Sequence, residues 1–170
     1  LPLRREAAAT LRWGEVDLDA GELRLSAEHG RKFKANQRVP LPGLAAELLA
    51  EIRPENPAAA DLEFPAAEGG PFRSWSALYR DLRASSGISS WSIHDFRRAM
   101  VSITAEVRPD VSETALDRLL THSASATNSG VKAVYQRASG LASQRIAADA
   151  WDAILRGALT GTVTQLRRAG

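Results

Sequence analysis

The chain has 170 residues, of which 44% are hydrophobic and 25% charged, and it contains no cysteine. A chain of this length forms one domain with a core large enough to fold without disulfides or a thiolate-bound structural zinc, and the lack of cysteine excludes both. The 22 Lys and Arg against 20 Asp and Glu leave a net charge of +2, so the distribution of basic residues is more informative about partners than their sum.

No run of the sequence approaches the roughly 20 apolar residues that a membrane-spanning helix needs. Leu1 begins no signal-peptide pattern, and the chain does not start with methionine. We therefore expect a cytoplasmic protein without a membrane partner, and we expect this chain to be a fragment of a longer one.

The first part of the chain predicts a helix followed by two pairs of antiparallel strands. Residues 4–12 mix arginine with the helix formers alanine and leucine. Apolar residues then alternate on both sides of an Asp-Ala-Gly triplet at 19–21, which is the pattern of a β-hairpin. A second pair is expected at 23–26 and 37–41, with the basic segment 28–36 as a long loop between its strands.

Two helices joined by an irregular connection are expected next. The first covers 43–53 and must stop there because of Pro54. The segment 55–72 is rich in proline and glycine, as surface connections are. Ser74 is a suitable N-cap for the second helix, which ends at Ser86-Gly87. The apolar faces of these helices comprise Leu44, Leu48, Leu49 and Ile52, and Trp75, Leu78, Tyr79 and Leu82.

Three more helices are expected in the rest of the chain. Apolar residues repeat at helical intervals from near His94 to Pro109, with Phe96 facing inward. Asp110 and Glu113 fit a capping box for the following helix.

That helix is expected to end before His122, and a polar loop follows over 123–130. A final helix over 141–155 presents Ile146 among its apolar residues, and 157–170 is typical of a loosely held tail. The fold class is therefore mainly α with a small antiparallel β-sheet.

Cofactor chemistry has no support in the sequence. There is no phosphate-binding glycine-rich loop, no GxGxxG and no nucleophile elbow around a serine. The three histidines, His29, His94 and His122, have no carboxylate at metal-ligand spacing, and Asp17 and Asp19 are explained by the turn that they flank. We predict no metal and no other cofactor.

A histidine and an arginine stand three residues apart in His94-Asp95-Phe96-Arg97. On a helix this spacing puts both side chains on one face, where both can reach the same anion. Further motifs stand on both sides of this pair: Arg4 in Leu3-Arg4-Arg5-Glu6, Lys32 seven positions before Val39-Pro40-Leu41, His122 in Leu120-Thr121-His122, and Tyr135 in Val134-Tyr135-Gln136-Arg137. Together, the six residues Arg4, Lys32, His94, Arg97, His122 and Tyr135 resemble, in their order, the catalytic residues of the tyrosine recombinase, or phage integrase, family.

The charges fit an attack on a DNA phosphodiester, whose transition state gains negative charge. Arg4 and Arg97 carry planar guanidinium groups that stay charged and suit phosphate oxygens. The phenol of Tyr135 must lose its proton to become a nucleophile, and His94 is a candidate for that transfer. The product would be a 3′-phosphotyrosyl link, so that rejoining needs neither ATP nor metal.

The resemblance implies further roles. It makes Lys32 the donor of a proton to the departing 5′ oxygen, a role for which Lys34 competes, and it makes His122 a hydrogen-bond donor to the phosphate. It implies double-stranded DNA and a tetramer on paired sites as partners, with the protein nucleoid-associated when bound to DNA. The other basic residues expected to contact DNA are Arg5, Arg31, Lys34, Arg38 and Arg98.

By the same resemblance, 1–157 form the catalytic domain, without its N-terminal helices and without the separate core-binding domain, and 158–170 form a C-terminal tail. Two positions depart from the family: Ala7 stands where glutamate is usual, and Thr121 where glycine is common. The alternatives are a non-catalytic DNA-binding remnant of an integrase, a type IB topoisomerase and, least supported, a carboxylate-metal nuclease. We expect Tyr79, four positions from Trp75, to pack in the core.

Overall fold

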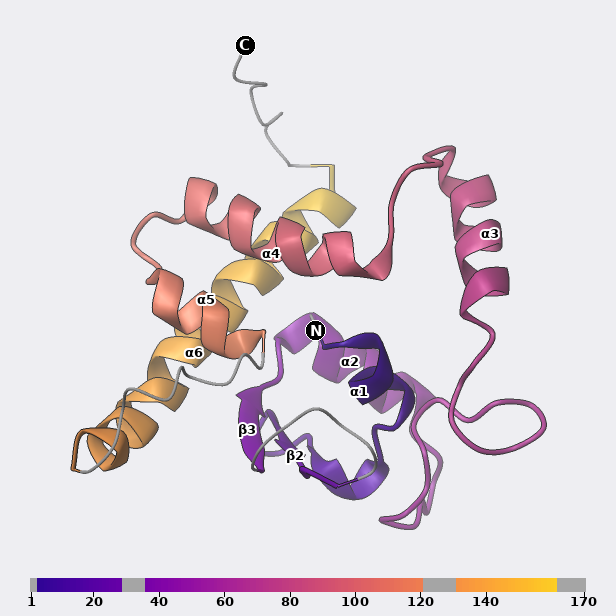
Figure 1. Ribbon diagram of the computed structural model, residues 1–170, viewed down its shortest axis with the longest axis horizontal. Coiled ribbons are helices and arrows are strands. Elements are labelled where there is room, and N and C mark those ends of the chain that lie inside the picture. The colour runs from indigo at the N-terminus through magenta and orange to yellow at the C-terminus, as the bar shows by residue number, and fades with distance from the viewer. Residues whose placement is uncertain (1–2, 29–35, 121–130, 162–170) are drawn as a thin grey trace.

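The computed structural model describes residues 3–28, 36–120 and 131–161, the stretch 131–139 through its backbone alone. It is rich in helix and contains one three-stranded antiparallel sheet, so the predicted α+β class is confirmed (Figure 1). The elements are α1 (Arg5–Ala9), the 3₁₀ turn η1 (Trp13–Glu15), β1 (Val16–Asp17), β2 (Glu22–Leu25), β3 (Gln37–Pro40), α2 (Gly43–Ile52), α3 (Trp75–Ser86), α4 (Ile93–Val107), α5 (Glu113–Leu119) and α6 (Val131–Leu159).

The sheet has the order β1-β2-β3, and both predicted strand pairs are confirmed. The turn between β1 and β2 forms because the Asp17 carboxylate accepts the backbone N–H of Ala20 at 2.9 Å, while Gly21 adopts a left-handed φ of 61°. Leu23 is paired with Val39 and is completely buried. One face of this small sheet therefore belongs to the core.

The long helix α6 is the element on which the core is assembled. It packs against α5, β3, α4 and α2 (Figure 1). Arg145 in its middle donates to the carbonyl oxygens of Leu41 at 3.1 Å and Gly21 at 2.6 Å. The Asp152 carboxylate accepts the N–H of Leu44 at 2.6 Å. These bonds fix α6 to the sheet and to the start of α2.

Two helices differ in length from the sequence prediction. The helix expected over 4–12 covers only α1, because the next residues pair with a distant segment: the N–H groups of Trp13 and Gly14 donate to the carbonyls of Asp61 and Ala59, each at 3.0 Å.

The helix expected over 141–155 begins ten residues earlier and runs past the boundary at 157 to Leu159. Gly140 lies inside it, and a Cβ there would come within 2.9 Å of Nη1 of Arg118. The close passage of the Arg118 side chain over α6 therefore accounts for a glycine within the helix.

Several side chains lie elsewhere than predicted. Phe96 is 55% exposed, whereas Arg97 on the same helix is only 4% exposed. In α2 only Leu49 is buried. The exposed apolar side chains include Leu48, Ile52, Leu82 and Ile146.

The caps also differ from the prediction. Ser112, not Asp110, caps α5, because its hydroxyl accepts the N–H of Ala115 at 3.2 Å. Asp110 instead accepts two hydrogen bonds from the guanidinium of Arg108. Ser74 precedes α3 but makes no side-chain capping bond.

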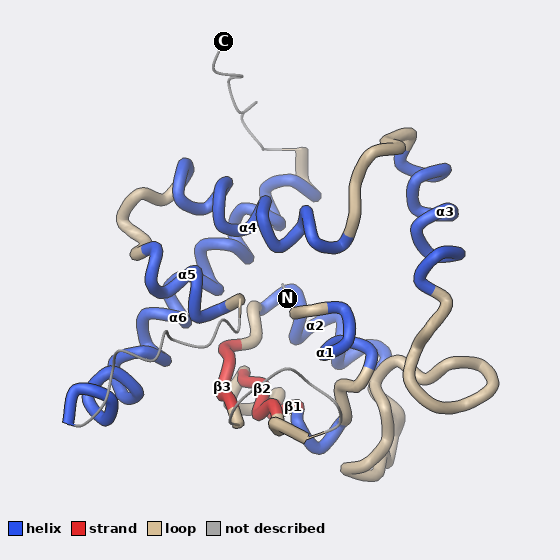
Figure 2. The backbone as a smooth tube through the Cα atoms, in the orientation of Figure 1, coloured by secondary structure: helices blue, strands red, loops and turns tan. Residues whose placement is uncertain are grey.

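Helix α3 stands apart from the other helices at one end of the molecule (Figure 1), and no residue of it is fully buried. A long irregular connection, drawn in tan in Figure 2, leads to it from α2 as predicted. Aromatic and cation–π contacts hold it: Arg5 lies over Trp75 at 5.9 Å and Tyr79 packs edge-on against Trp91 at 5.8 Å. In the part of the chain that is described, none of the helices is long and apolar enough to cross a membrane.

Candidate phosphate-binding site

A pocket of about 400 Å³ opens where the start of the chain, α3 and the first turn of α4 meet. The segments that form it are far apart in sequence, so only the tertiary fold brings them together. The side chains that line it are mostly polar or basic, and the full set is Arg4, Arg5, Tyr79, Ser92, Ile93, His94 and Arg97.

Arg97 forms the buried wall of this pocket. Its Nη2 donates to the carbonyl oxygen of Leu120 at 2.7 Å, so it links α4 to the end of α5. Burial of the guanidinium, and then the charge of Arg4, lowers the pKa of Arg97 below its usual value. The same guanidinium stays charged at neutral pH, because arginine remains protonated in proteins.

Arg4 precedes α1 and is half-buried. Arg4 and Arg97 line the same pocket, and the charge of Arg4 contributes to the lowered pKa of Arg97. None of the residues described along the lining carries a carboxylate. Two cations in such surroundings create a positive potential, which an anion in the pocket would stabilise.

His94 is the second residue of α4 and is exposed at the pocket. The helix start that carries it is fixed by the Asp95 carboxylate, which accepts the N–H and the hydroxyl of Ser92, each at 2.8 Å. Hydrogen bonds from the Ser92 side chain and then from its backbone lower the pKa of Asp95. The acidic side chain next to His94 is thus engaged in capping the helix.

Tyr79 is a pocket residue that the sequence did not indicate. Packing in the core was expected, but its ring is half-buried and it lines the pocket, where its hydroxyl oxygen accepts the N–H of Ile93 at 3.1 Å. The signal available in the sequence is weak: a tyrosine on an apolar helix face has a hydroxyl that needs a partner.

Three of the six predicted catalytic residues, Arg4, His94 and Arg97, are brought together in this pocket. The other three, Lys32, His122 and the side chain of Tyr135, lie outside the described residues, as do Arg31 and Lys34. The backbone of Tyr135 belongs to α6, near its start.

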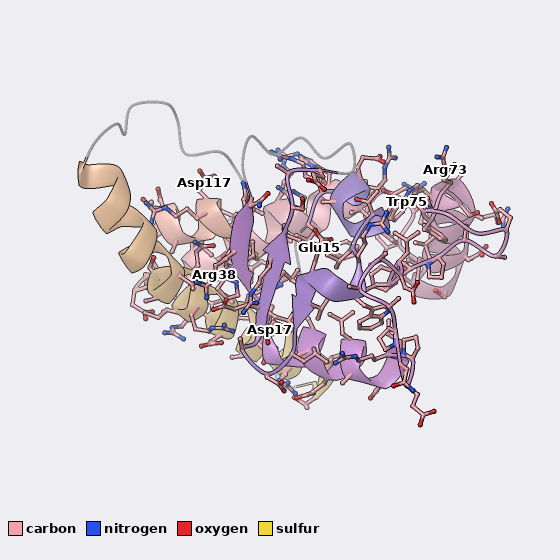
Figure 3. The ribbon with its side chains drawn as sticks, turned by 90° about the horizontal axis from the view of Figure 1, so that it is seen from below. Glu15, Asp17, Arg38, Arg73, Trp75 and Asp117 are labelled. Carbon is pink, nitrogen blue, oxygen red and sulfur yellow. The ribbon has the colours of Figure 1, made fainter. Side chains whose placement is uncertain are left out.

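The remaining predicted DNA contacts have different surroundings. Arg5 lines the pocket, and Arg98 is exposed on α4. Arg38 lies on the sheet, where its Nη2 donates to Oε2 of Glu22 at 2.6 Å. Figure 3 shows Arg38 beside the strands, well away from Trp75 and α3.

The site is interpreted from its own residues, since comparisons of this chain with protein-family models, curated proteins and solved structures find no match. Among the described residues, no group of three His, Cys, Asp or Glu side chains could hold a metal ion. The described side chains place three guanidinium groups, an imidazole and a phenol around one space, a set suited to binding an oxyanion.

Proposed function

We propose that this chain is the catalytic domain of a tyrosine-type DNA strand transferase, a site-specific recombinase or integrase that cuts and rejoins DNA through Tyr135. The observation that carries the proposal is the convergence of Arg4 with His94 and Arg97 on one pocket. The three residues match the family's catalytic positions by their order in the sequence. If that match of short motifs were due to chance, there would be no reason for Arg4 to lie beside the start of α4.

The pocket suits a scissile phosphodiester. In the transition state of the transfer, charge accumulates on the nonbridging oxygens, and preorganised cations near them lower the barrier. Arg97 is held in place by the carbonyl of Leu120, so little reorganisation is needed when the charge develops. Arg4 provides the second cation from near the start of the chain.

The reaction balances without a cofactor. The phenol oxygen of Tyr135 attacks phosphorus, the bond to the 5′ oxygen breaks, and the 3′ phosphate stays on the tyrosine. His94 takes the phenol proton, and the ammonium of Lys32, or of Lys34 on the same loop, gives a proton to the 5′ oxygen. His122 hydrogen-bonds the phosphate. Attack by a 5′ hydroxyl reverses these steps and rejoins the strand.

The proposal includes the finer expectations about the domain and its partners. Residues 1–157 act as the DNA-breaking and rejoining unit on double-stranded DNA, within a tetramer that holds two duplexes. Arg5 at the pocket and Arg98 on α4 contact neighbouring backbone phosphates, which positions DNA without reading its sequence.

The decisive experiment is covalent capture. The chain is incubated with a pool of nicked duplexes that are randomised around the nick, and adducts that survive denaturant are isolated and sequenced. Tyr135→Phe should abolish the adduct. Tyr79→Phe is the comparison variant, because the chain has two tyrosines, and it should reduce the adduct without abolishing it. An undiminished adduct after Tyr135→Phe, or no adduct from the unmodified chain, contradicts the proposal.

Two further measurements separate the alternatives. Salt-sensitive DNA binding without any adduct would favour the non-catalytic remnant. Relaxation of a supercoiled plasmid that carries one site would favour a topoisomerase, because a recombinase needs paired sites.

A further inference from the structure

We propose that the Tyr79 hydroxyl donates a hydrogen bond to the phosphate held by Arg4, His94 and Arg97. This makes Tyr79 a second functional tyrosine, which binds the phosphate where Tyr135 attacks it. The inference deepens the proposed function and rests on it, because the proposed function places the phosphate in this pocket.

The position of the Tyr79 oxygen is fixed relative to the other phosphate ligands. It accepts the N–H of Ile93 at 3.1 Å. Ile93 is the first residue of α4, His94 is the next, and Arg97 follows one helical turn later. The hydroxyl is therefore tied to the same rigid element that carries two of the three phosphate-binding side chains.

The ring of Tyr79 is fixed as well. Trp91 packs edge-on against it at 5.8 Å, and the Arg83 guanidinium lies 5.3 Å from its centre. Arg83 in turn donates to the carbonyl oxygen of Trp91. A donor held in this way loses little conformational entropy when a ligand binds, which is a property of preorganised sites.

The hydroxyl proton of Tyr79 is available to form a hydrogen bond with an anion. A tyrosine hydroxyl can donate one hydrogen bond as well as accept. Among the described residues, the Tyr79 hydroxyl accepts the N–H of Ile93 and has no acceptor for its own proton. No carboxylate lines the described pocket to take that proton. A phosphate oxygen between Arg97 and Tyr79 would accept it, as a charge-assisted hydrogen bond.

A fluorine label on Tyr79 tests the inference, because the chain has only two tyrosines. With Tyr135→Phe in place, Tyr79 is the remaining tyrosine, so incorporation of 3-fluorotyrosine gives one fluorine resonance, that of residue 79. The probe is inorganic phosphate. We expect the fluorine resonance to move and saturate with the same dissociation constant as the backbone amides of the first turn of α4.

Removal of the hydroxyl should weaken phosphate binding. Tyr79→Phe is expected to lower the affinity about tenfold, the effect of a hydrogen bond to a charged group. Trp91→Phe is the matched control, because it alters the packing of the same ring but keeps the hydroxyl, and its affinity should stay within about twofold of the unmodified chain. A purely structural role would make both variants weaken binding together.

Three results would overturn the inference: a fluorine resonance that stays still while the α4 amides shift, an unchanged affinity in a folded Tyr79→Phe, or no saturable phosphate binding at all. If Tyr79→Phe fails to fold, the fluorine titration still decides. The proposed function fails differently. Loss of the DNA adduct with normal phosphate binding refutes strand transfer, whereas phosphate binding that ignores Tyr79 refutes only the present inference.

Discussion

Arginines lie in two contrasting environments in this molecule. At the junction of α6 with the sheet and α2, they meet acidic or carbonyl oxygens: Arg156 contacts Asp152 and Glu47 at 2.7 and 2.6 Å, and Arg145 donates to backbone carbonyls. The hydrogen bonds that Arg156 donates to Glu47 and then to Asp152 raise the pKa of Arg156 above its ordinary value. These arginines join one element to another.

At the pocket the environment is reversed. Arg97 is more buried than either of those arginines, and its charged neighbour is another arginine, Arg4, so its pKa is lowered where that of Arg156 is raised. Charges kept together against their mutual repulsion are typical of functional sites. The comparison shows that acidic partners raise the pKa of Arg156, whereas burial and then a basic neighbour lower the pKa of Arg97.

The largest expected effect is at Arg97. Arg97→Lys keeps the positive charge but loses the planar pair of donors, so we expect the rate of adduct formation on nicked DNA to fall by about 100-fold or more. Arg108→Lys is the control, because Arg108 follows the other end of α4, pairs with Asp110 and does not line the pocket, and this variant should cleave at nearly the unmodified rate. Equal losses in the two variants would mean that Arg97 has no special place at the phosphate.

Arg145 tests the opposite environment. Arg145→Met should lower the free energy of unfolding by about 2 kcal/mol, because the part-buried carbonyl of Leu41 loses its side-chain donor and that of Gly21 keeps only the N–H of Leu41. Arg24→Met is the matched control: Arg24 pairs with Asp17 at the surface of the sheet, with its side chain 59% exposed, and should cost less than about 0.5 kcal/mol. Urea denaturation measures both, and phosphate binding by folded Arg145→Met should be normal.

The features that sequence reasoning predicted are those set by neighbours along the chain. Both strand pairs follow from alternation and from the turn that Asp17 closes, and α2 and α4 end where Pro54 and Pro109 require. The sequence also predicted that Arg4 and Arg97 lie close together. That prediction came from the order of the motifs that resemble a known family, and not from periodicity or composition.

The features that it missed depend on contacts across the fold. Phe96 and Arg97 are adjacent on a helix, and which one turns inward depends on the Leu120 carbonyl that Arg97 meets. Gly140 disfavours a long helix in the sequence, and the contact that explains a glycine there, the Arg118 side chain, comes from another element. Tyr79 looks like a packing residue until the N–H of Ile93 is found against its hydroxyl.

A smaller loss of stability is expected on replacing Asp152, whose carboxylate takes the place of a side-chain N-cap for α2. Pro42 precedes α2 and has no side-chain acceptor, and the carboxylate of Asp152 receives the N–H of Leu44 instead. Asp152→Ala should therefore cost about 1 kcal/mol of unfolding free energy, as the loss of an N-cap does. Asp149→Ala, an exposed position on the same helix, should have no measurable effect. Equal losses would show that the carboxylate of Asp152 contributes nothing to α2.

The smallest effect concerns Asp95, which follows His94 in α4. Its pKa is lowered in the folded chain by hydrogen bonds from Ser92, so its contribution to stability is present above the unfolded pKa of about 3.9 and is lost as the pH falls through the folded value. Asp95→Asn should thus lower the melting temperature slightly at pH 7 and not at all in strong acid. Its phosphate affinity should change little, because this carboxylate is engaged by Ser92 and does not line the pocket. A large gain in phosphate affinity would mean that the Asp95 carboxylate offsets the charges of Arg4 and Arg97. The pocket arginines would then have an acidic neighbour, as Arg156 has in α6, and the contrast between the two regions would fail.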